Sequence, residues 1–383
     1  MSASALTRPG ERDRPTVKIA QIDWTFCLFV TAIACFGALM MFSVAGSSWT
    51  PWAANHLIRY ALFFGLMIAL ALIDIRVWFA LSYPVYAVAL LLLVAVEVAG
   101  DVRMGAQRWL SIGPFSFQPS EIMKIGIVMA LARFYHGASA QTARLSWRLL
   151  IPGAMIGVPF ALVAHQPDLG TAMLILFTGL AVVFLAGLSW KIIITGAAAA
   201  ITAIPPIVMF VLHDYQRQRV MTFLDPESDP SGSGYHILQS MIALGSGGLL
   251  GKGYGLGSQS QLDYLPEKHT DFIFATLAEE FGFVGCTFLL TLYAAVIFMA
   301  LRTASLSHSH YGRLAAAGVT ATFACYLLIN GAMVMGLAPV VGVPMPLLSY
   351  GGTVAMTVMI GFGLVQSVRV HRYSEVGSSK GLF

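Results

Sequence analysis

The chain has 383 residues, of which 57% are hydrophobic and 10% are charged, and its formal net charge is +4. A mean hydropathy of +0.77 is higher than a soluble domain requires, so the composition excludes an ordinary soluble protein. The cysteines lie in apolar segments at spacings that fit no metal site, which favours a packing role for Cys27, Cys35, Cys286 and Cys325.

Apolar runs of about 20 residues recur along the chain, and runs of this length are typical of transmembrane helices. Lipid offers no hydrogen-bond partner to the backbone, so helices are the expected spanning elements. A β-barrel would need alternating strands of about ten residues, and no such pattern is present. We predict one all-α, polytopic integral membrane domain over 1–383 with about ten transmembrane helices, at 22–46, 54–74, 77–99, 118–136, 149–166, 170–188, 191–212, 272–301, 311–335 and 350–369.

Charge placement predicts the orientation of these spans. An even number puts both termini on one side, where 14 of the 22 Lys and Arg residues then fall, against 6 in the opposite loops. Because cytoplasmic loops carry the excess of Lys and Arg, we expect cytoplasmic tails at 1–20 and 370–383. The connection at 213–271 then becomes one long outer loop, and loops of this length are usually functional or disordered.

The outer loop at 213–271 contains apolar pieces and many glycines. These predict re-entrant or interfacial helices at the membrane surface, with a flexible glycine-rich linker as the alternative. The glycines also suggest a phosphate cradle, but the nucleotide-binding pattern G-x-x-x-x-G-K-[ST] fails because Gly253 follows Lys252. The sequence therefore indicates no nucleotide site in this loop.

The run LDYLPEKHTD at 262–271 has an unusual density of ionisable side chains for this chain. Charges near lipid are costly, and a cluster of them usually has a function. Asp271 precedes the apolar run FIFATLA and fits two roles, as the N-cap of the next helix or as a partly desolvated general base. Asp263 lies eight residues earlier, and paired carboxylates are common in sugar chemistry. The residues beside Asp271 could tune it or contact a substrate: Glu267, Lys268 and His269.

Further candidates lie in one intramembrane pair and in the outer connections. Glu121 and Lys124, three residues apart, share a helix face and fit either an ion pair or a polar cavity wall. Arg108 beside Trp109 suits an anionic headgroup, because guanidinium binds phosphate and Trp prefers the membrane interface. The other candidates are Asp168 of HQPDLGTA, Arg217 and Arg219 after the seventh span, and Ser349 of PVVGVPMPLLSYGGT. Asp168 also fits an N-cap. The uncharged segment around Ser349 predicts a rigid, re-entrant outer loop.

Five segments together resemble the SEDS family of cell-wall proteins: GAQRWLSIGPFSFQPSEIMKI, QPDLGTA, RVMTFLDPESDPSGSGYHILQSMIALGSGGLLGKG, SQSQLDYLPEKHTDFIFATLAEEFGFVG and GLAPVVGVPMPLLSYGGT. They extend from the third predicted helix to the last. Within the family, GSGGLLGKG and the lysine at Lys268 are more similar to the elongation branch, RodA, than to the division branch, FtsW.

The resemblance implies a peptidoglycan glycosyltransferase that polymerises lipid II into β-1,4 glycan during elongation and rod-shape maintenance. It also implies a bacterial inner-membrane location with the active site facing outside. The implied partners are lipid II, a class B penicillin-binding protein that acts as transpeptidase, other membrane proteins of the elongation machinery and membrane lipids, but no nucleic acid.

By the same resemblance, the catalytic aspartate corresponds to Asp271, the acidic residue eight positions earlier to Asp263, the intramembrane pair to Glu121 and Lys124, and the arginine of an RW motif to Arg108. No cofactor is predicted, and a divalent cation (Mg²⁺ or Mn²⁺) is left open. Three alternatives also stay open: a lipid II flippase, the division-specific paralogue and a non-catalytic scaffold. A flippase would concentrate charge near the bilayer midplane, whereas most of the unusual charge here lies in an outer loop.

Overall fold

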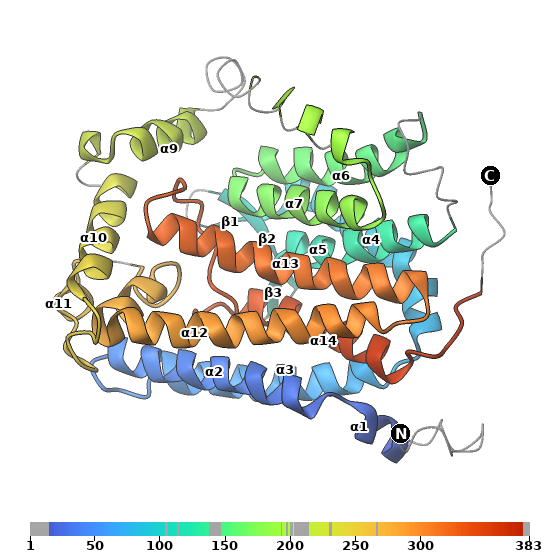
Figure 1. The fold of residues 1–383 in the computed structure, drawn as a ribbon. Helices are drawn as coiled ribbons and strands as arrows, with labels where there is room; N and C mark the ends of the chain where they lie inside the picture. Colours follow the sequence, from blue (N-terminus) through green and yellow to red (C-terminus); the bar gives the residue numbers. More distant parts are fainter. Residues whose placement is uncertain are drawn as a thin grey trace.

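The protein is described by a computed structural model covering residues 15–103, 106–112, 115–137, 147–192, 194–196, 198–199, 202, 214–229, 232–265 and 267–377. In these ranges it is mainly a bundle of long helices lying side by side along a common direction (Figure 1). The bundle helices are α2 (Trp24–Val44), α3 (Trp52–Ala71), α4 (Ile75–Ala99), α5 (Pro119–His136), α6 (Leu150–His165), α7 (Leu169–Leu185), α12 (Ile273–Ser305), α13 (His310–Val334) and α14 (Gly352–Val370). Two short helices precede the bundle or connect its members: α1 (Pro15–Gln21) and the 3-10 turn η2 (Trp147–Leu149).

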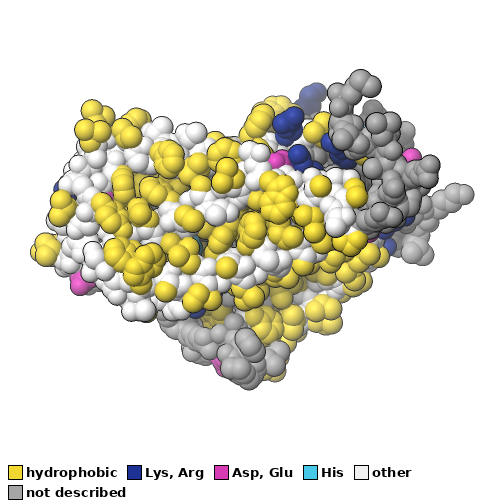
Figure 2. Space-filling view, turned by 90° about the horizontal axis from the view of Figure 1, so that it is seen from below, with side chains coloured by type: hydrophobic (Ala, Val, Ile, Leu, Met, Phe, Trp, Pro, Cys, Tyr) yellow, Lys and Arg dark blue, Asp and Glu magenta, His cyan; other side chains and the backbone are white. Residues whose placement is uncertain are grey.

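Six of these helices are long and apolar enough to cross a membrane: α2, α3, α4, α12, α13 and α14. The helices α6 and α7 are equally apolar but have only 16 and 17 residues. The helix α5 has 18 residues but carries both Glu121 and Lys124. Hydrophobic side chains spread over the face seen from below, as a lipid-facing surface requires (Figure 2).

Nine of the ten predicted spans coincide with helices of the structure. Most of the remaining one, 191–212, lies outside the described residues, so the total of ten stays a prediction. The tails at 1–20 and 370–383 are described only in part.

The all-α prediction was wrong over the connection between α4 and α5. This connection forms a three-stranded antiparallel sheet of β1 (Asp101–Arg103), β2 (Ala106–Ile112) and β3 (Phe115–Phe117). Asp101 pairs with Trp109 and Leu110 with Phe117. Two of the strands have only three residues, which is too short for an alternating pattern to stand out in the sequence.

The helix α12 is broken near its start. Gly282 has φ 62° and ψ −159°, so the helical path divides into a short piece at 273–281 and a long one at 283–305. This backbone region is accessible almost only to glycine, because a Cβ would clash. The predicted span at 272–301 therefore consists of two helical pieces rather than one straight rod.

The connection at 213–271, which the sequence predicts as an outer loop, contains the helices α9 (Asp214–Leu224), α10 (Ser233–Ser246) and α11 (Ser258–Gln261), with a 3-10 turn η3 at Pro226–Ser228. α10 packs against α12 and α13. In Figure 1, α10 and α11 lie at the end of the bundle away from α1.

A second connection, between α13 and α14, enters the bundle. A Cβ placed on Gly37, two turns inside the end of α2, would come within 2.7 Å of the carbonyl oxygens of Leu347 and Leu348. Tyr293 of α12 donates a hydrogen bond to the Pro346 carbonyl at 2.5 Å. The segment between Gly336 and Gly351 is thus packed among helices, and its re-entry into the membrane stays a prediction.

Candidate active site

Asp271 lies in the turn that leads into α12 and is partly buried. The expectation that it caps this helix was wrong: the N-cap is Phe272, and no side chain makes a capping bond there. The Asp271 backbone is held instead from α13. Asn330 Nδ2 donates to the carbonyl oxygens of Asp271 at 2.8 Å and of Val343 at 2.7 Å. One buried amide thus ties this turn to the re-entrant segment.

The surroundings of Asp271 favour its neutral form more than water would. Burial raises the pKa of the Asp271 carboxyl to about 6; the charge of Glu267 adds to the rise, and that of Arg219 opposes it. A carboxyl group with this pKa is mostly ionised at neutral pH, yet it is a stronger base than an ordinary aspartate. Its electrostatics therefore suit proton abstraction from a hydroxyl group.

Asp263, unlike Asp271, is exposed. Its side chain is 81% exposed and accepts a hydrogen bond from Lys268 Nζ at 2.5 Å. This bond and the charge of Lys268 lower the pKa of the Asp263 carboxyl. Lys268 itself is buried and also donates to the Ser260 carbonyl at 2.6 Å. Asp263 therefore serves as the ion-pair partner of Lys268, and the two aspartates do not form a shared carboxyl pair.

His269 forms an aromatic group with residues that the sequence reasoning missed. Its ring stacks on Trp52 of α3 at 4.4 Å between centroids with 14° between the planes, and its carbonyl accepts a bond from Tyr350 N at 2.9 Å. The guanidinium of Arg59 lies 4.8 Å from the centroid of the Tyr350 ring. Burial lowers the pKa of His269, which favours the neutral form of its imidazole. Three aromatic rings and one cation therefore lie together beside the turn that contains Asp271.

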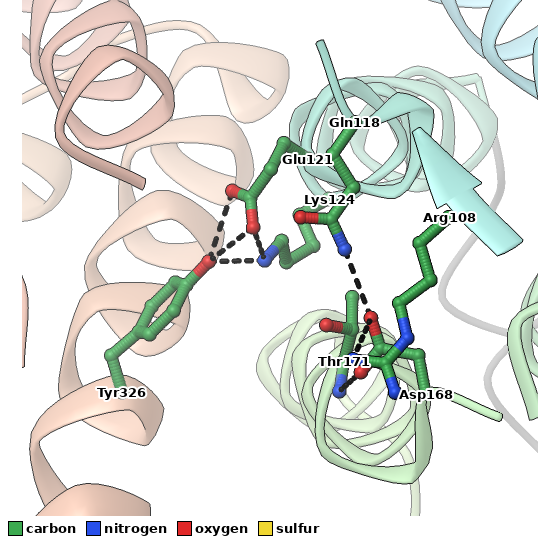
Figure 3. A network of polar contacts seen from close by, with 7 residues as sticks. All are labelled: Arg108, Gln118, Glu121, Lys124, Asp168, Thr171 and Tyr326. Carbon is green, nitrogen blue, oxygen red and sulfur yellow. Dashed lines mark hydrogen bonds and ion pairs between the residues drawn. The ribbon is translucent and has the colours of Figure 1, made fainter. Parts of the chain in front are cut away.

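A second polar cluster lies on the first turns of α5 (Figure 3). Lys124 Nζ is 2.6 Å from Glu121 Oε1 and also donates to the hydroxyl of Tyr326 on α13. The Tyr326 hydroxyl in turn donates to Glu121 Oε2 at 3.1 Å. All three side chains are buried, so the predicted ion pair is present and is completed by a tyrosine that sequence spacing did not indicate.

Arg108 and Asp168 form a further polar contact beside this cluster (Figure 3). Asp168 is the N-cap of α7: its Oδ1 accepts a bond from Thr171 N at 3.1 Å, as the sequence allowed. Its Oδ2 accepts from Gln118 Nε2 at 2.9 Å and lies 3.9 Å from Arg108 Nη1. Strand β2 is thereby tied to the starts of α5 and α7.

The two clusters are joined by α13. Asn330, which holds the Asp271 turn, and Tyr326, which completes the Lys124 ion pair, are four residues apart and so lie one turn apart on the same face. Neither carries a charge, so neither attracted attention in the sequence. One face of α13 thus contacts both the turn that contains Asp271 and the Glu121–Lys124 pair.

The remaining predicted residues differ in burial and in their contacts. Arg217 is exposed on α9, and Arg219, two residues later, is the one whose charge acts on Asp271. Ser349 is buried, and its hydroxyl accepts a hydrogen bond from Met345 N at 2.9 Å within the re-entrant segment. Trp109 is half-buried in β2. Glu267 is exposed and accepts from the Thr270 hydroxyl at 2.8 Å. Within the described ranges, no group of three or more His, Cys, Asp or Glu side chains is arranged to hold a metal ion.

Comparison with known proteins places this arrangement in a family. The profile of the FtsW/RodA/SpoVE cell cycle protein family matches residues 23–374. The peptidoglycan glycosyltransferase MrdB of Escherichia coli K12 is 44% identical over 351 residues, covering 92% of this chain and 94% of MrdB. The probable peptidoglycan glycosyltransferase FtsW of Trichlorobacter lovleyi is 33% identical over 370 residues, which cover 93% of this chain and 95% of that protein.

Solved structures agree with these relatives. A chain from a peptidoglycan synthase complex, described as coordinating polymerization and crosslinking, superimposes with a TM-score of 0.78 at 33% identity, covering 92% of this chain and 99% of the other. The rod shape determining protein RodA of Thermus thermophilus superimposes with a TM-score of 0.67 at 29% identity over 92% and 98%. The chain described above is therefore a member of the FtsW/RodA/SpoVE family of cell cycle proteins.

Proposed function

We propose that this protein polymerises lipid II into β-1,4 glycan strands during cell elongation, with Asp271 as general base. The chain is a peptidoglycan glycosyltransferase by its relationship to MrdB, at 44% identity over 92% of its length. The observation that carries the assignment of the base is the raised pKa of Asp271, about 6, in a turn held from α13. A base of this strength accepts a proton from a hydroxyl group as that oxygen becomes a nucleophile.

In this mechanism Asp271 removes the proton from the 4-hydroxyl group of the acceptor sugar. The oxygen attacks the anomeric carbon of the donor with inversion, and the polyprenyl pyrophosphate leaves. Cations near the leaving group stabilise the developing negative charge. The aromatic surface of Trp52, His269 and Tyr350 suits a sugar face, because it presents flat apolar rings close to Asp271 in sequence and space.

The contacts of the cationic side chains indicate which of them could bind the pyrophosphate. Lys124, Arg108 and Lys268 each face a carboxylate within the protein. Arg59 lies over Tyr350 at the edge of the aromatic surface, and the charge of Arg219 acts on Asp271 itself. We therefore infer that Arg59 contacts the leaving group, while Lys124 and Arg108 keep the bundle in shape, and that Arg219 acts through its charge on Asp271. Arg217, two residues before Arg219, is a weaker candidate because it is exposed.

The orientation and partners belong to the same proposal. We infer a location in the bacterial cytoplasmic membrane with both termini in the cytoplasm and Asp271 towards the outside. The start of α2 and the end of α14 are tied by an ion pair between Asp23 and Arg369 at 2.7 Å, at the bundle end away from α10 and α11. A class B penicillin-binding protein is the proposed partner, since a structure with TM-score 0.78 belongs to a peptidoglycan synthase complex.

Purified protein given lipid II already at the outer face of vesicles tests the activity. We expect glycan products from the wild type and a loss of at least about 100-fold for Asp271→Asn, the order associated with a general base. Asp263→Asn removes an exposed carboxylate and serves as the matched control, with a much smaller expected loss. A flippase would make no glycan in this assay, and robust synthesis by Asp271→Asn would refute the base assignment. A complementation experiment separates the elongation role from that of the division paralogue. This protein should restore rod shape to cells depleted of their elongation polymerase, and it should not restore division to cells depleted of the division paralogue.

A further inference from the structure

Glu279 is fully buried in the short helical piece at 273–281, and the mechanism above does not use it. Its Oε1 accepts bonds from Lys252 Nζ at 2.7 Å, Ser258 Oγ at 3.0 Å and Gln259 N at 3.1 Å. Its Oε2 accepts from Gln259 N as well, at 3.1 Å. A buried carboxylate is very costly unless it is paired and hydrogen-bonded. All of these donors come from one stretch of the outer loop, residues 252–259.

The same stretch also replaces the hydrogen bonds that α12 loses at its break. Lys252 N and Gly253 N donate to the carbonyls of Glu279 and Glu280, at 2.9 and 3.1 Å. On the other side of the break, Phe283 N donates to the Gly248 carbonyl at 2.9 Å. Helix ends leave such groups without partners inside the helix. The short helical piece is therefore terminated by the outer loop rather than by its own continuation.

The approach at this break is close enough to require glycine. Gly251 has φ +80°, and a Cβ added there would lie 2.1 Å from the Glu280 carbonyl oxygen. Any other residue would push the loop away from the helix. The glycines of GSGGLLGKG, which the sequence could not assign to a phosphate site, thus allow the loop to seat against α12.

The loop also reaches the other side of Asp271. Ser260, in α11, accepts the bond from Lys268 Nζ at 2.6 Å, and Lys268 lies three residues before Asp271. Glu279 lies eight residues after Asp271. One continuous segment, 252–263, therefore holds the chain on both sides of the base, through Lys268 in front and Glu279 behind.

We propose that Glu279 is a positioning residue for Asp271: by accepting bonds from Lys252, Ser258 and Gln259, it fixes the helical piece 273–281 and with it the partly desolvated location of the base. This inference rests on the proposed function. When the Glu279 contacts are weakened, the short piece keeps its backbone bonds to the loop but loses its side-chain anchor, and water gains access to Asp271. The base then becomes weaker and less well placed, although it is still present.

The test is the pH dependence of lipid II polymerisation by purified Glu279→Gln protein. We expect kcat at pH 7.5 to fall about tenfold or more, because small misplacements of a catalytic group are costly, while KM changes little. We also expect the acid limb of the kcat profile to move to lower pH, since a better-solvated Asp271 has a lower pKa. The charges that act on Asp271, Glu267 and Arg219, are unchanged in this variant.

Glu280→Gln is the matched control. Glu280 is the next residue and is equally buried, but its side chain accepts a bond from Ser43 of α2. We expect its acid limb to coincide with that of the wild type. If Glu279→Gln does not fold, Lys252→Met decides the question, because Lys252 is partly exposed and its loss should move the limb in the same direction by a smaller amount.

The outcomes separate this inference from the proposed function. An acid limb that stays in place in Glu279→Gln or Lys252→Met, with kcat reduced only in proportion to the folded fraction, would overturn the positioning role. In that case Asp271→Asn would still be inactive. Activity in Asp271→Asn would instead refute the base assignment itself.

Discussion

Replacing Asp271 by asparagine is expected to abolish polymerisation and also to make the folded protein more stable. The pKa of Asp271 rises from its ordinary value of 3.8 to about 6, mainly through burial. Each pKa unit corresponds to about 1.4 kcal/mol, so the ionised carboxylate costs the folded state at most about 3 kcal/mol above pH 6. Asparagine keeps the shape of the side chain without the charge and removes this cost.

The sign follows from proton binding. Between pH 4 and pH 6 the folded protein binds the Asp271 proton more tightly than the unfolded chain does. The contribution of Asp271 to the free energy of unfolding therefore falls as the pH rises through that window. The melting temperatures of wild type and Asp271→Asn should therefore agree near pH 4 and diverge above pH 6, with the variant a few degrees higher. Both proteins share all other titrating groups, so the difference between them isolates Asp271.

Differential scanning fluorimetry in one detergent, at a series of pH values, measures this difference. Circular dichroism should confirm that both proteins keep the same helical content. A variant that melts below the wild type at pH 7.5, or a difference that does not depend on pH, would refute the reasoning from desolvation.

Three further predictions follow from named contacts. The kcat of the wild type should fall about tenfold per pH unit below about pH 6, where Asp271 becomes protonated, and the Asp263→Asn control should keep the same limb because the pKa of Asp263 is lowered instead. Lys124→Met should lower the free energy of unfolding by roughly 3–5 kcal/mol, because it leaves the Glu121 carboxylate buried and uncompensated. The double variant with Glu121→Gln should recover most of the lost melting temperature. No recovery would contradict a pairing role. Asn330→Ala should lower the free energy of unfolding by about 1–3 kcal/mol for each of the two carbonyl groups that it leaves unsatisfied, and it should also lower kcat. Thr322→Ala, on the same helix, removes only a bond to Gly318 and should leave kcat close to that of the wild type.

The sequence was informative wherever a single residue or a long run carries the signal. Runs of apolar residues located nine helices, because length and hydropathy alone decide whether a segment can cross lipid. Asp271 and the Glu121–Lys124 pair were found because charges are rare in this chain. The short strands at 101–117 escaped notice, since three residues do not make a pattern.

The rest of the candidate site depends on contacts between distant parts of the chain. Trp52 meets His269 across more than two hundred residues, and Asn330 meets Asp271 across fifty-nine. Both are uncharged or aromatic residues in apolar segments, where the sequence alone reads as ordinary packing. Asp263 shows another contact that spacing could not indicate: its exposed carboxylate pairs with Lys268, and its catalytic role stays a prediction.

The buried acidic residues supply the strongest physical argument for the special role of Asp271. Glu121 is paired with Lys124, Asp168 faces Arg108, and Glu279 is paired with Lys252. Each of these carboxylates is a fixed structural element, because its charge is already compensated. Among the described residues the Asp271 carboxylate has no ion-pair partner, and its pKa is raised rather than lowered. Glu280 is also buried without an ion-pair partner among the described residues, but its carboxylate accepts a hydrogen bond from Ser43. A carboxylate kept partly desolvated and uncompensated costs stability, and the bonds through Asn330, Lys268 and Glu279 that hold its surroundings indicate that the fold sustains this cost at Asp271. That combination is expected of a base whose partner is the substrate.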